Sequence, residues 1–290
     1  MHNIAITTEC VADLPRELLE REEIDLIYYD VQTDRGLFRD TDEVDSENIM
    51  EYMRGGEKKA QSIVPGANEY KNFFKRKLER YDEIVHICIS GATSVAFENA
   101  KLARAKLGID GRRICLIDSG HLSSGMGLMV MAAAECRNKG MGSREIEEHL
   151  KEMAPSVSTT FLANNLEYLY YNGKVSRSTL KLCSFLQFHP VLCMRNGKLT
   201  LKNGYFGKYE RAAQKYIADT LKKAKQIDLG MGFLTYAGCN HELRERIKKE
   251  IGKRIEFREF WEQQASATVS CNCGPLTFGI LYVMKGVSPK

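Results

Sequence analysis

The sequence has no long apolar run. Its longest apolar stretch, from Met126 to Ala134, is far shorter than the roughly 20 residues that a membrane-spanning helix needs. The first residues, Met1 to Ile6, have no basic segment followed by an apolar one, so we expect no signal peptide. We therefore expect a protein that is not embedded in a membrane.

Basic residues are not gathered into a run. The formal net charge is +4, and the lysines and arginines are spread over segments that are also rich in glutamate. No basic run is interleaved with aromatic residues at a spacing that would stack bases. Nucleic acid is therefore not an expected partner.

The nine cysteines do not have the spacing of a metal site. The one close pair, Cys271 and Cys273, is too tightly spaced for a zinc knuckle, and no second pair completes four ligands. Most of the others lie inside apolar segments, as free thiols of a reducing compartment do: Cys88, Cys115, Cys136, Cys183 and Cys193. We expect a cytoplasmic protein with no metal.

Motifs of common enzyme classes are also missing. Ser94 lacks the flanking glycines of a nucleophile elbow, because Ala92 and Ala96 stand at those positions. There is no phosphate-binding loop ending in Gly-Lys-Ser/Thr and no Gly-x-Gly-x-x-Gly, so no cofactor is expected. These absences favour ligand recognition over catalysis. A hydrolase-like or kinase-like enzyme with Ser94 in its site, acting on a small acidic or phosphorylated metabolite, remains the alternative.

The patterning that is present indicates an α/β protein of two domains. The first domain, residues 1–155, alternates helices with nearly continuous apolar strands at 3–8, 24–31, 83–89 and 113–117. This order predicts a three-layer α/β/α arrangement around a mainly parallel sheet.

The second domain, residues 156–290, has a different character. Asn196-Gly197 is a strong hairpin signal, and residues 209–225 form a basic amphipathic helix. Further strands are expected at 254–260, 265–272 and 278–284. This order predicts a two-layer α/β domain with a mixed sheet. The basic helix also leaves open a protein-interaction module, although such a face is usually only solvated.

The stretch from Ile87 to Ala100 reads as a strand, a hydroxyl-rich turn and a helix. Thr93 or Ser94 would be the N-cap of that helix. The unpaired N–H groups of a helix start can hold a carboxylate or a phosphate. Taken alone, the stretch is more often a simple cap than an anion site.

Six ordered motifs across nearly the whole chain resemble those of the DegV family of bacterial fatty-acid-binding proteins. The matching segments lie at 9–15, 60–66, 89–100, 117–127, 166–176 and 272–276. The fifth is intact from Leu166 to Ser176, whereas Asn272 replaces a histidine in the last. In this family two α/β domains enclose one long-chain fatty acid, and the loaded protein presents it to a separate fatty-acid kinase.

The resemblance also implies site residues. The carboxylate would be held by hydroxyls and nearby donors at Ser94, Thr93, Gln61 or its neighbour Ser62, Asn272 and Lys208. The tail would lie among Phe161, Leu162, Leu166, Phe185 and Phe188. This is physically reasonable, because a buried carboxylate needs several donors and each buried CH₂ contributes about 0.8 kcal/mol.

Overall fold

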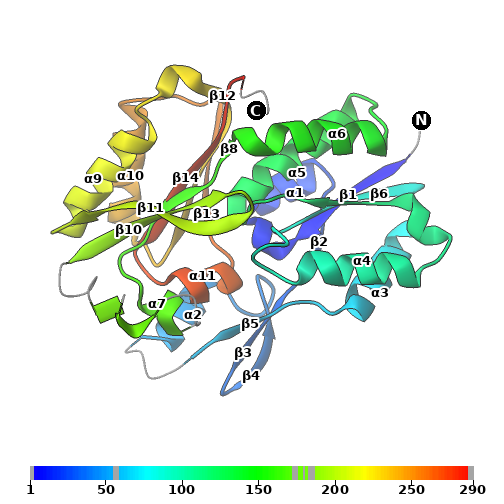
Figure 1. The fold of residues 1–290 in the computed structure, drawn as a ribbon, viewed down its shortest axis with the longest axis horizontal. Coiled ribbons are helices and arrows are strands. Elements are labelled where there is room, and N and C mark those ends of the chain that lie inside the picture. The colour runs from blue at the N-terminus through cyan, green and yellow to red at the C-terminus, as the bar shows by residue number, and fades with distance from the viewer. Residues whose placement is uncertain (1–2, 55–58, 172–175, 179, 182–186, 287–290) are drawn as a thin grey trace.

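The computed structural model describes residues 3–54, 59–171, 176–178, 180–181 and 187–286. Two sheets lie side by side, one in each half of the chain (Figure 1). We call residues 1–155 the N-terminal half and residues 156–290 the C-terminal half. No helix in the described ranges is long and apolar enough to cross a membrane.

The N-terminal half contains the predicted parallel sheet. Its order is β2-β1-β6-β7, from strands β1 (Ile4–Glu9), β2 (Asp25–Ile27), β6 (Glu83–Cys88) and β7 (Ile114–Asp118). All three strand pairings are parallel. Helices cover both faces (Figure 1): α3 (Ala67–Leu78) and α4 (Ala96–Lys106) on one, and α1 (Arg16–Arg21), α5 (Ser123–Asn138) and α6 (Ser143–Met153) on the other. The predicted three-layer architecture is confirmed.

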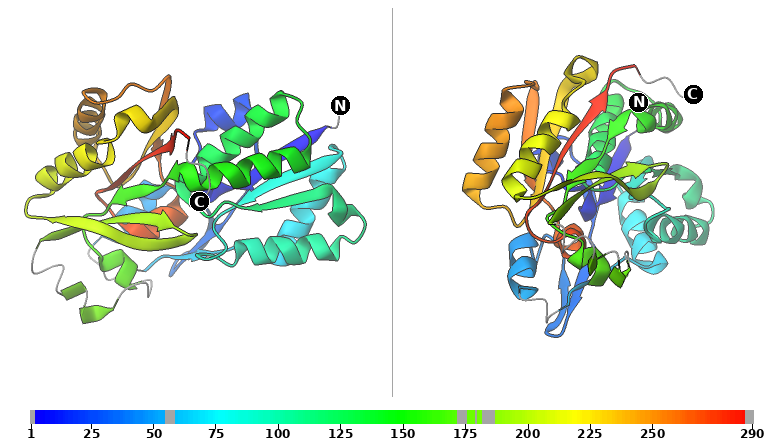
Figure 2. Two further views of the ribbon diagram at one scale, coloured as in Figure 1. Left: turned by 45° about the horizontal axis from the view of Figure 1, so that its top comes forward. Right: turned by 60° about the vertical axis from the view of Figure 1, so that its left-hand side comes forward.

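The C-terminal half contains the predicted mixed sheet. Its strands are β8 (Val157–Ser158), β9 (Thr160–Leu162), β10 (Phe188–Arg195), β11 (Lys198–Phe206), β12 (Ile227–Ala237), β13 (Glu259–Gln264) and β14 (Thr277–Met284). The order is β11-β10-β9-β14-β12-β13, with β8 beside β14. Among these described strands, β12 and β13 pair in parallel and the other pairs are antiparallel. Helices α9 (Tyr209–Thr220) and α10 (His241–Gly252) cover one face (Figure 2). Asn196 and Gly197 form the predicted hairpin turn between β10 and β11.

A third, small antiparallel sheet was not predicted. It consists of β3 (Asp30–Thr33), β4 (Gly36–Arg39) and β5 (Gln61–Ile63), in the order β4-β3-β5. The apolar run 24–31, expected as one strand, is divided between β2 in the parallel sheet and β3 in this one. Helix α2 (Ser46–Tyr52) follows β4 and packs beneath the C-terminal half (Figure 1).

The strand expected at 265–272 is wrong. This segment is helix α11 (Ala267–Cys273), capped by the side chain of Ser266, which accepts a hydrogen bond from Val269 N. The strand expected at 254–260 lies later in the sequence, where β13 runs from Glu259 to Gln264. The remaining short elements are α7 (Glu167–Tyr171) and the 3₁₀ helices η1 (Cys10–Ala12), η2 (Asp110–Arg113), η3 (Ala154–Ser156) and η4 (Ala224–Gln226).

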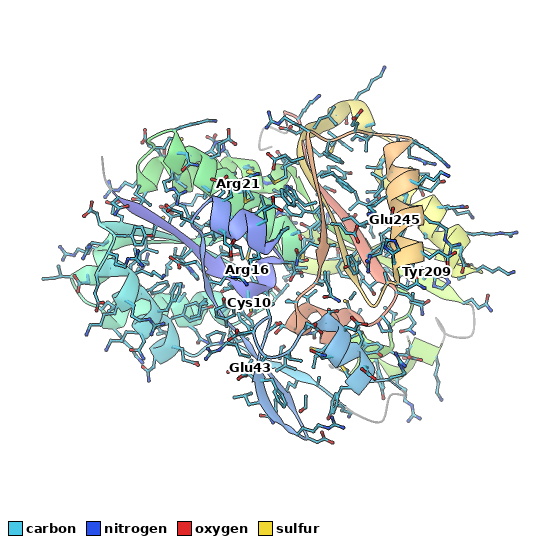
Figure 3. All side chains as sticks on the ribbon, turned by 180° about the vertical axis from the view of Figure 1, so that it is seen from behind. Cys10, Arg16, Arg21, Glu43, Tyr209 and Glu245 are labelled. Carbon is cyan, nitrogen blue, oxygen red and sulfur yellow. The ribbon has the colours of Figure 1, made fainter. Side chains whose placement is uncertain are left out.

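Helix α5 joins the two halves. A Cβ on Gly125 would lie 1.9 Å from Thr159 Oγ1, so a glycine is required for this close approach. The hydroxyls of Ser124 and Thr235 are 2.6 Å apart. At the surface, Arg21 on α1 lies at the junction of the halves (Figure 3), and its Nη1 is 3.1 Å from Glu259 Oε2. The main core therefore includes buried side chains from both sheets.

Candidate functional site

A cavity of about 780 Å³ lies between the two halves. Its walls come from the loop after β6, the start of α5, strands β9, β11, β12 and β14, and helices α7 and α11. Most of these walls are apolar, and the lining residues of the described chain include no carboxylate and no histidine. Because ligand sites usually are such largely apolar cavities with a few polar groups, this is the candidate functional site.

Four of the predicted head-group residues line this cavity: Ser62, Thr93, Ser94 and Asn272. They come from β5, from the loop after β6 and from α11, which are far apart in sequence. The fold therefore gathers hydroxyl and amide groups from both halves around one space.

The hydroxyls of the loop after β6 do not cap α4 as expected. The helix begins at Ala96, and its N-cap is Val95, whose side chain makes no capping hydrogen bond. Ser94 Oγ accepts a hydrogen bond from Ala96 N at 3.2 Å, whereas Thr93 Oγ1 donates to Ser90 O at 2.9 Å. The Ser94 hydroxyl accepts in this bond, so its proton is free to be donated to an acceptor in the cavity.

Two other predicted residues lie outside the cavity lining. Gln61 is exposed and pairs with Gln32 between β5 and β3. Lys208 is exposed and is the N-cap of α9. The lining instead includes Lys198, the first residue of β11, which the sequence analysis missed.

Lys198 lies beside the hairpin turn that touches the loop after β6. Ser90 Oγ donates a hydrogen bond to Gly197 O at 2.6 Å. This bond connects the tip of the β10–β11 hairpin to the N-terminal half at one edge of the cavity. Among the described lining residues Lys198 is the sole formal cation.

The predicted tail residues are only partly in place. Phe161 and Leu166 line the cavity. Leu162 is fully buried in the core of the C-terminal half, and Phe188 packs against Phe206. Phe185 lies outside the described residues. Apolar lining residues that the prediction missed include Leu169, Leu192, Leu199, Leu201, Val269 and Leu281.

Helix α11, which carries Asn272, is anchored by two buried carboxylates of the N-terminal half. Asp13 Oδ1 accepts from Ser266 N at 2.8 Å. Asp40 accepts from Ala267 N and from Thr268 N, each at 2.8 Å. Burial raises the pKa of Asp13 to about 7 and also raises the pKa of Asp40. A helix start carries unpaired N–H groups, so these acids hold one wall of the cavity in position.

A third buried acid supports the loop after β6. Glu9 accepts hydrogen bonds from the Tyr70 hydroxyl at 2.6 Å and from Ile89 N at 2.8 Å. Burial raises the pKa of Glu9 to about 7 against the opposing effect of these bonds. Each carboxyl oxygen therefore already accepts one hydrogen bond.

Glu9, His86 and Cys88 form a buried polar cluster near the loop after β6. Possible ligand atoms of Glu9, His86 and Cys88 lie within 4.8 Å of one another, the spacing of a candidate metal site. However, the Glu9 oxygens are occupied, and His86 Nδ1 is 2.9 Å from Thr7 Oγ1. Burial lowers the pKa of His86 to about 3 and raises that of Cys88, so the thiol stays protonated. Glu9 and His86 therefore each already have a hydrogen-bond partner within this buried cluster.

His121 and His189 each bridge two segments of the chain. His121 contacts Thr159 Oγ1 and Ala154 O through its two ring nitrogens, at 2.8 and 2.9 Å. His189 contacts Asn164 O and Gly207 O, each at 2.7 Å. Both rings are therefore fully engaged. All cysteines within the described ranges are free thiols.

Comparison with known proteins agrees with this architecture. The chain is 25% identical over 290 residues to a DegV domain-containing protein of Caldanaerobacter subterraneus, which covers 98% of this chain and 100% of that protein. It is 25% identical over 289 residues to protein DegV of Bacillus subtilis, covering 98% of this chain and 100% of that one.

Solved structures share the fold at lower identity. A DegV family protein of Thermus thermophilus, described as binding fatty acid, has a TM-score of 0.86 at 21% identity and covers 97% of this chain and 99% of its own. A stearic-acid-binding protein of Eubacterium ventriosum also has a TM-score of 0.86, at 18% identity, and covers 98% of this chain and 99% of its own. The family described as "Uncharacterised protein, DegV family" matches residues 3–285. The chain therefore belongs to the DegV family.

Proposed function

We propose that this protein binds one long-chain fatty acid in the cavity between its halves and has no catalytic activity of its own. The observation that carries the proposal is the polarity of the cavity, in which Ser62, Ser94 and Asn272 adjoin a mostly apolar space of about 780 Å³. Family members from Thermus thermophilus and Eubacterium ventriosum, described as binding fatty acid and stearic acid, support the choice of ligand.

The carboxylate would lie against Ser94 and Ser62, with Asn272 and Lys198 nearby. A carboxylate removed from water needs several donors to offset its desolvation. The acyl chain would lie along Leu166, Leu199 and the other apolar lining residues. At about 0.8 kcal/mol per buried CH₂, a tail of roughly 16 carbons gives a gross gain of roughly 13 kcal/mol, before the cost of immobilising the ligand.

We further propose that residues 1–155 and 156–290 act as the two domains that enclose the ligand. The loaded protein would present the carboxyl group to a separate fatty-acid kinase in the cytoplasm, as the family resemblance implies. Two exposed apolar side chains next to the polar residues support a docking role. Val95 follows Ser94 and is 61% exposed, and Ile63 follows Ser62 and is 38% exposed.

The enzyme alternative has less support. A nucleophilic serine needs a general base within hydrogen-bond reach. The lining residues of the described chain include no imidazole and no carboxylate. Lys198, the lysine among them, is exposed, and none of its contacts joins it to Ser94. Ser94 is therefore assigned to binding.

The test is to extract purified protein with organic solvent and identify the released lipid by mass spectrometry. We expect one long-chain fatty acid per chain, and the delipidated protein should rebind one equivalent of hexadecanoate. Protein that is purified empty and also fails to bind added hexadecanoate would refute the proposal.

A further inference from the structure

Tyr29 has a buried hydroxyl without a hydrogen-bond partner at the edge of the cavity. The residue is 2% exposed, and its hydroxyl oxygen makes no hydrogen bond to any described residue. The same side chain belongs to the cavity lining. Because an unsatisfied buried polar group costs about 1–3 kcal/mol, such a group calls for a partner.

The backbone of Tyr29 is fixed in place. Tyr29 N donates to Cys10 Sγ at 3.2 Å, and Tyr29 O accepts from Asp40 N at 2.9 Å. Cys10 lies near the middle of the molecule, below α1 (Figure 3). The backbone of Tyr29 is therefore fixed between the end of β2 in the parallel sheet and the start of β3 in the small antiparallel sheet.

The neighbours of the hydroxyl indicate which kind of partner it lacks. It lies close enough to Ser94 and Glu9 for both to influence its pKa, which burial and the Glu9 carboxyl raise and the Ser94 hydroxyl lowers. The phenol therefore keeps its proton and can donate. Each Glu9 oxygen already accepts a hydrogen bond, from Tyr70 or from Ile89, so an acceptor beside Ser94 would give the phenol a partner of its own.

We propose that the Tyr29 hydroxyl donates a hydrogen bond to a carboxylate oxygen of the ligand, next to the Ser94 hydroxyl. This inference rests on the proposed function and extends it to a residue outside the six matched motif segments. The side chain of Asn272 is neutral. Lys198 is the one formal cation among the described lining residues, and it is exposed. A buried phenol donor would supply part of the stabilisation that a second cation would give.

The test compares Tyr29→Phe with Tyr28→Phe. Tyr28 is the adjacent residue, is 40% exposed and is absent from the cavity lining, so its change is a matched control. Affinities for hexadecanoate and for hexadecan-1-ol would be measured by calorimetry. We expect Tyr29→Phe to weaken hexadecanoate binding about 10-fold or more, since hydrogen bonds to charged groups contribute about 1.5–3 kcal/mol. Its effect on the alcohol should be smaller, and Tyr28→Phe should change neither affinity.

An unchanged affinity for hexadecanoate would overturn the inference, because the partner of the hydroxyl would then be a water molecule and not the ligand. An equal loss of affinity for both ligands would also overturn it, because the effect would then come from packing. If Tyr29→Phe fails to fold, the hexadecanoate complex of the unaltered protein decides. The Tyr29 hydroxyl should lie within about 3.2 Å of a carboxylate oxygen, and a separation that excludes a hydrogen bond overturns the inference. Failure of the unaltered protein to bind hexadecanoate would instead refute the proposed function, and the inference with it.

Discussion

Asp40 Oδ2 accepts a hydrogen bond from Thr268 N at 2.8 Å, although the two residues are 228 positions apart. Thr268 lies in the first turn of α11, whose residues line the cavity. The N-terminal half thus supplies the acid that fixes a wall belonging to the C-terminal half. The shape of the cavity depends on such contacts between the halves.

Asp40→Asn should destabilise the protein and weaken ligand binding. An amide has one acceptor oxygen, so it cannot accept from both Ala267 N and Thr268 N as the carboxylate does. We expect a loss of about 1–3 kcal/mol in the free energy of unfolding by chemical denaturation. Asp42→Asn is the control, because Asp42 is an exposed acid two residues away. Equal stability of the two variants would contradict the anchoring role.

The contribution of Glu9 and Asp13 to the free energy of unfolding should fall as the pH rises from 5 to 8. Burial raises the pKa of Glu9 from 4.5 to about 7 and that of Asp13 from 3.8 to about 7. Between the pKa of the unfolded chain and that of the folded protein, each acid keeps a proton in the folded protein that it has released in the unfolded chain. The stabilisation from these two acids is therefore complete below about pH 4 and is lost as the pH passes 7.

The variant Glu9→Gln measures how much of this pH dependence of stability comes from Glu9. Because glutamine does not titrate, the decline in stability between pH 5 and 8 should become shallower by up to roughly 3 kcal/mol. Glu20→Gln, a change at an exposed glutamate on α1, should keep the original slope. A Glu9→Gln profile parallel to that of the unaltered protein would show that Glu9 is not the titrating group.

Replacing both Ser62 and Ser94 by alanine should weaken hexadecanoate binding without unfolding the protein. Each change removes a hydroxyl donor from the cavity, and a loss of about 10-fold or more is expected for the pair. Ser143→Ala, at the start of α6, is the control. Ser62→Ala should weaken binding more than Gln61→Ala, since only Ser62 lines the cavity. Unchanged affinity of the double variant would remove both serines from the head-group site.

Lys198→Gln should reduce the affinity for hexadecanoate about threefold at low ionic strength and less at high salt. Lys198 is exposed, so its attraction for a carboxylate is weak and screened by ions. Lys202→Gln changes an exposed lysine on the same strand that is absent from the cavity lining. Equal salt dependence of binding in the two variants would show that Lys198 does not contact the head group.

The sequence predicted features that depend on local patterns. Alternating apolar strands and helices identified the parallel sheet, and Asn196-Gly197 identified the hairpin, because a type of turn is determined by adjacent residues. The motif resemblance also identified Ser62, Ser94 and Asn272, all of which line the cavity.

Features that depend on distant contacts were not predicted. Residues 265–272 have the apolar and β-branched character of a strand, but Asp13 and Asp40 satisfy the N–H groups of a helix start there. Tyr29 gave no signal, because an unpartnered hydroxyl is visible only when its surroundings are known. The alternation of Leu199 and Leu201 along β11 is typical of one strand face and could have identified both as lining residues.

The most direct test of the account is the crystal structure of the protein with hexadecanoate. We predict the acyl chain in the cavity between the two sheets, with a carboxylate oxygen within about 3.2 Å of Ser94 Oγ. A fatty acid bound outside this cavity would contradict the account. So would a fatty acid bound in the cavity in the reverse orientation, with its tail rather than its carboxylate beside Ser94.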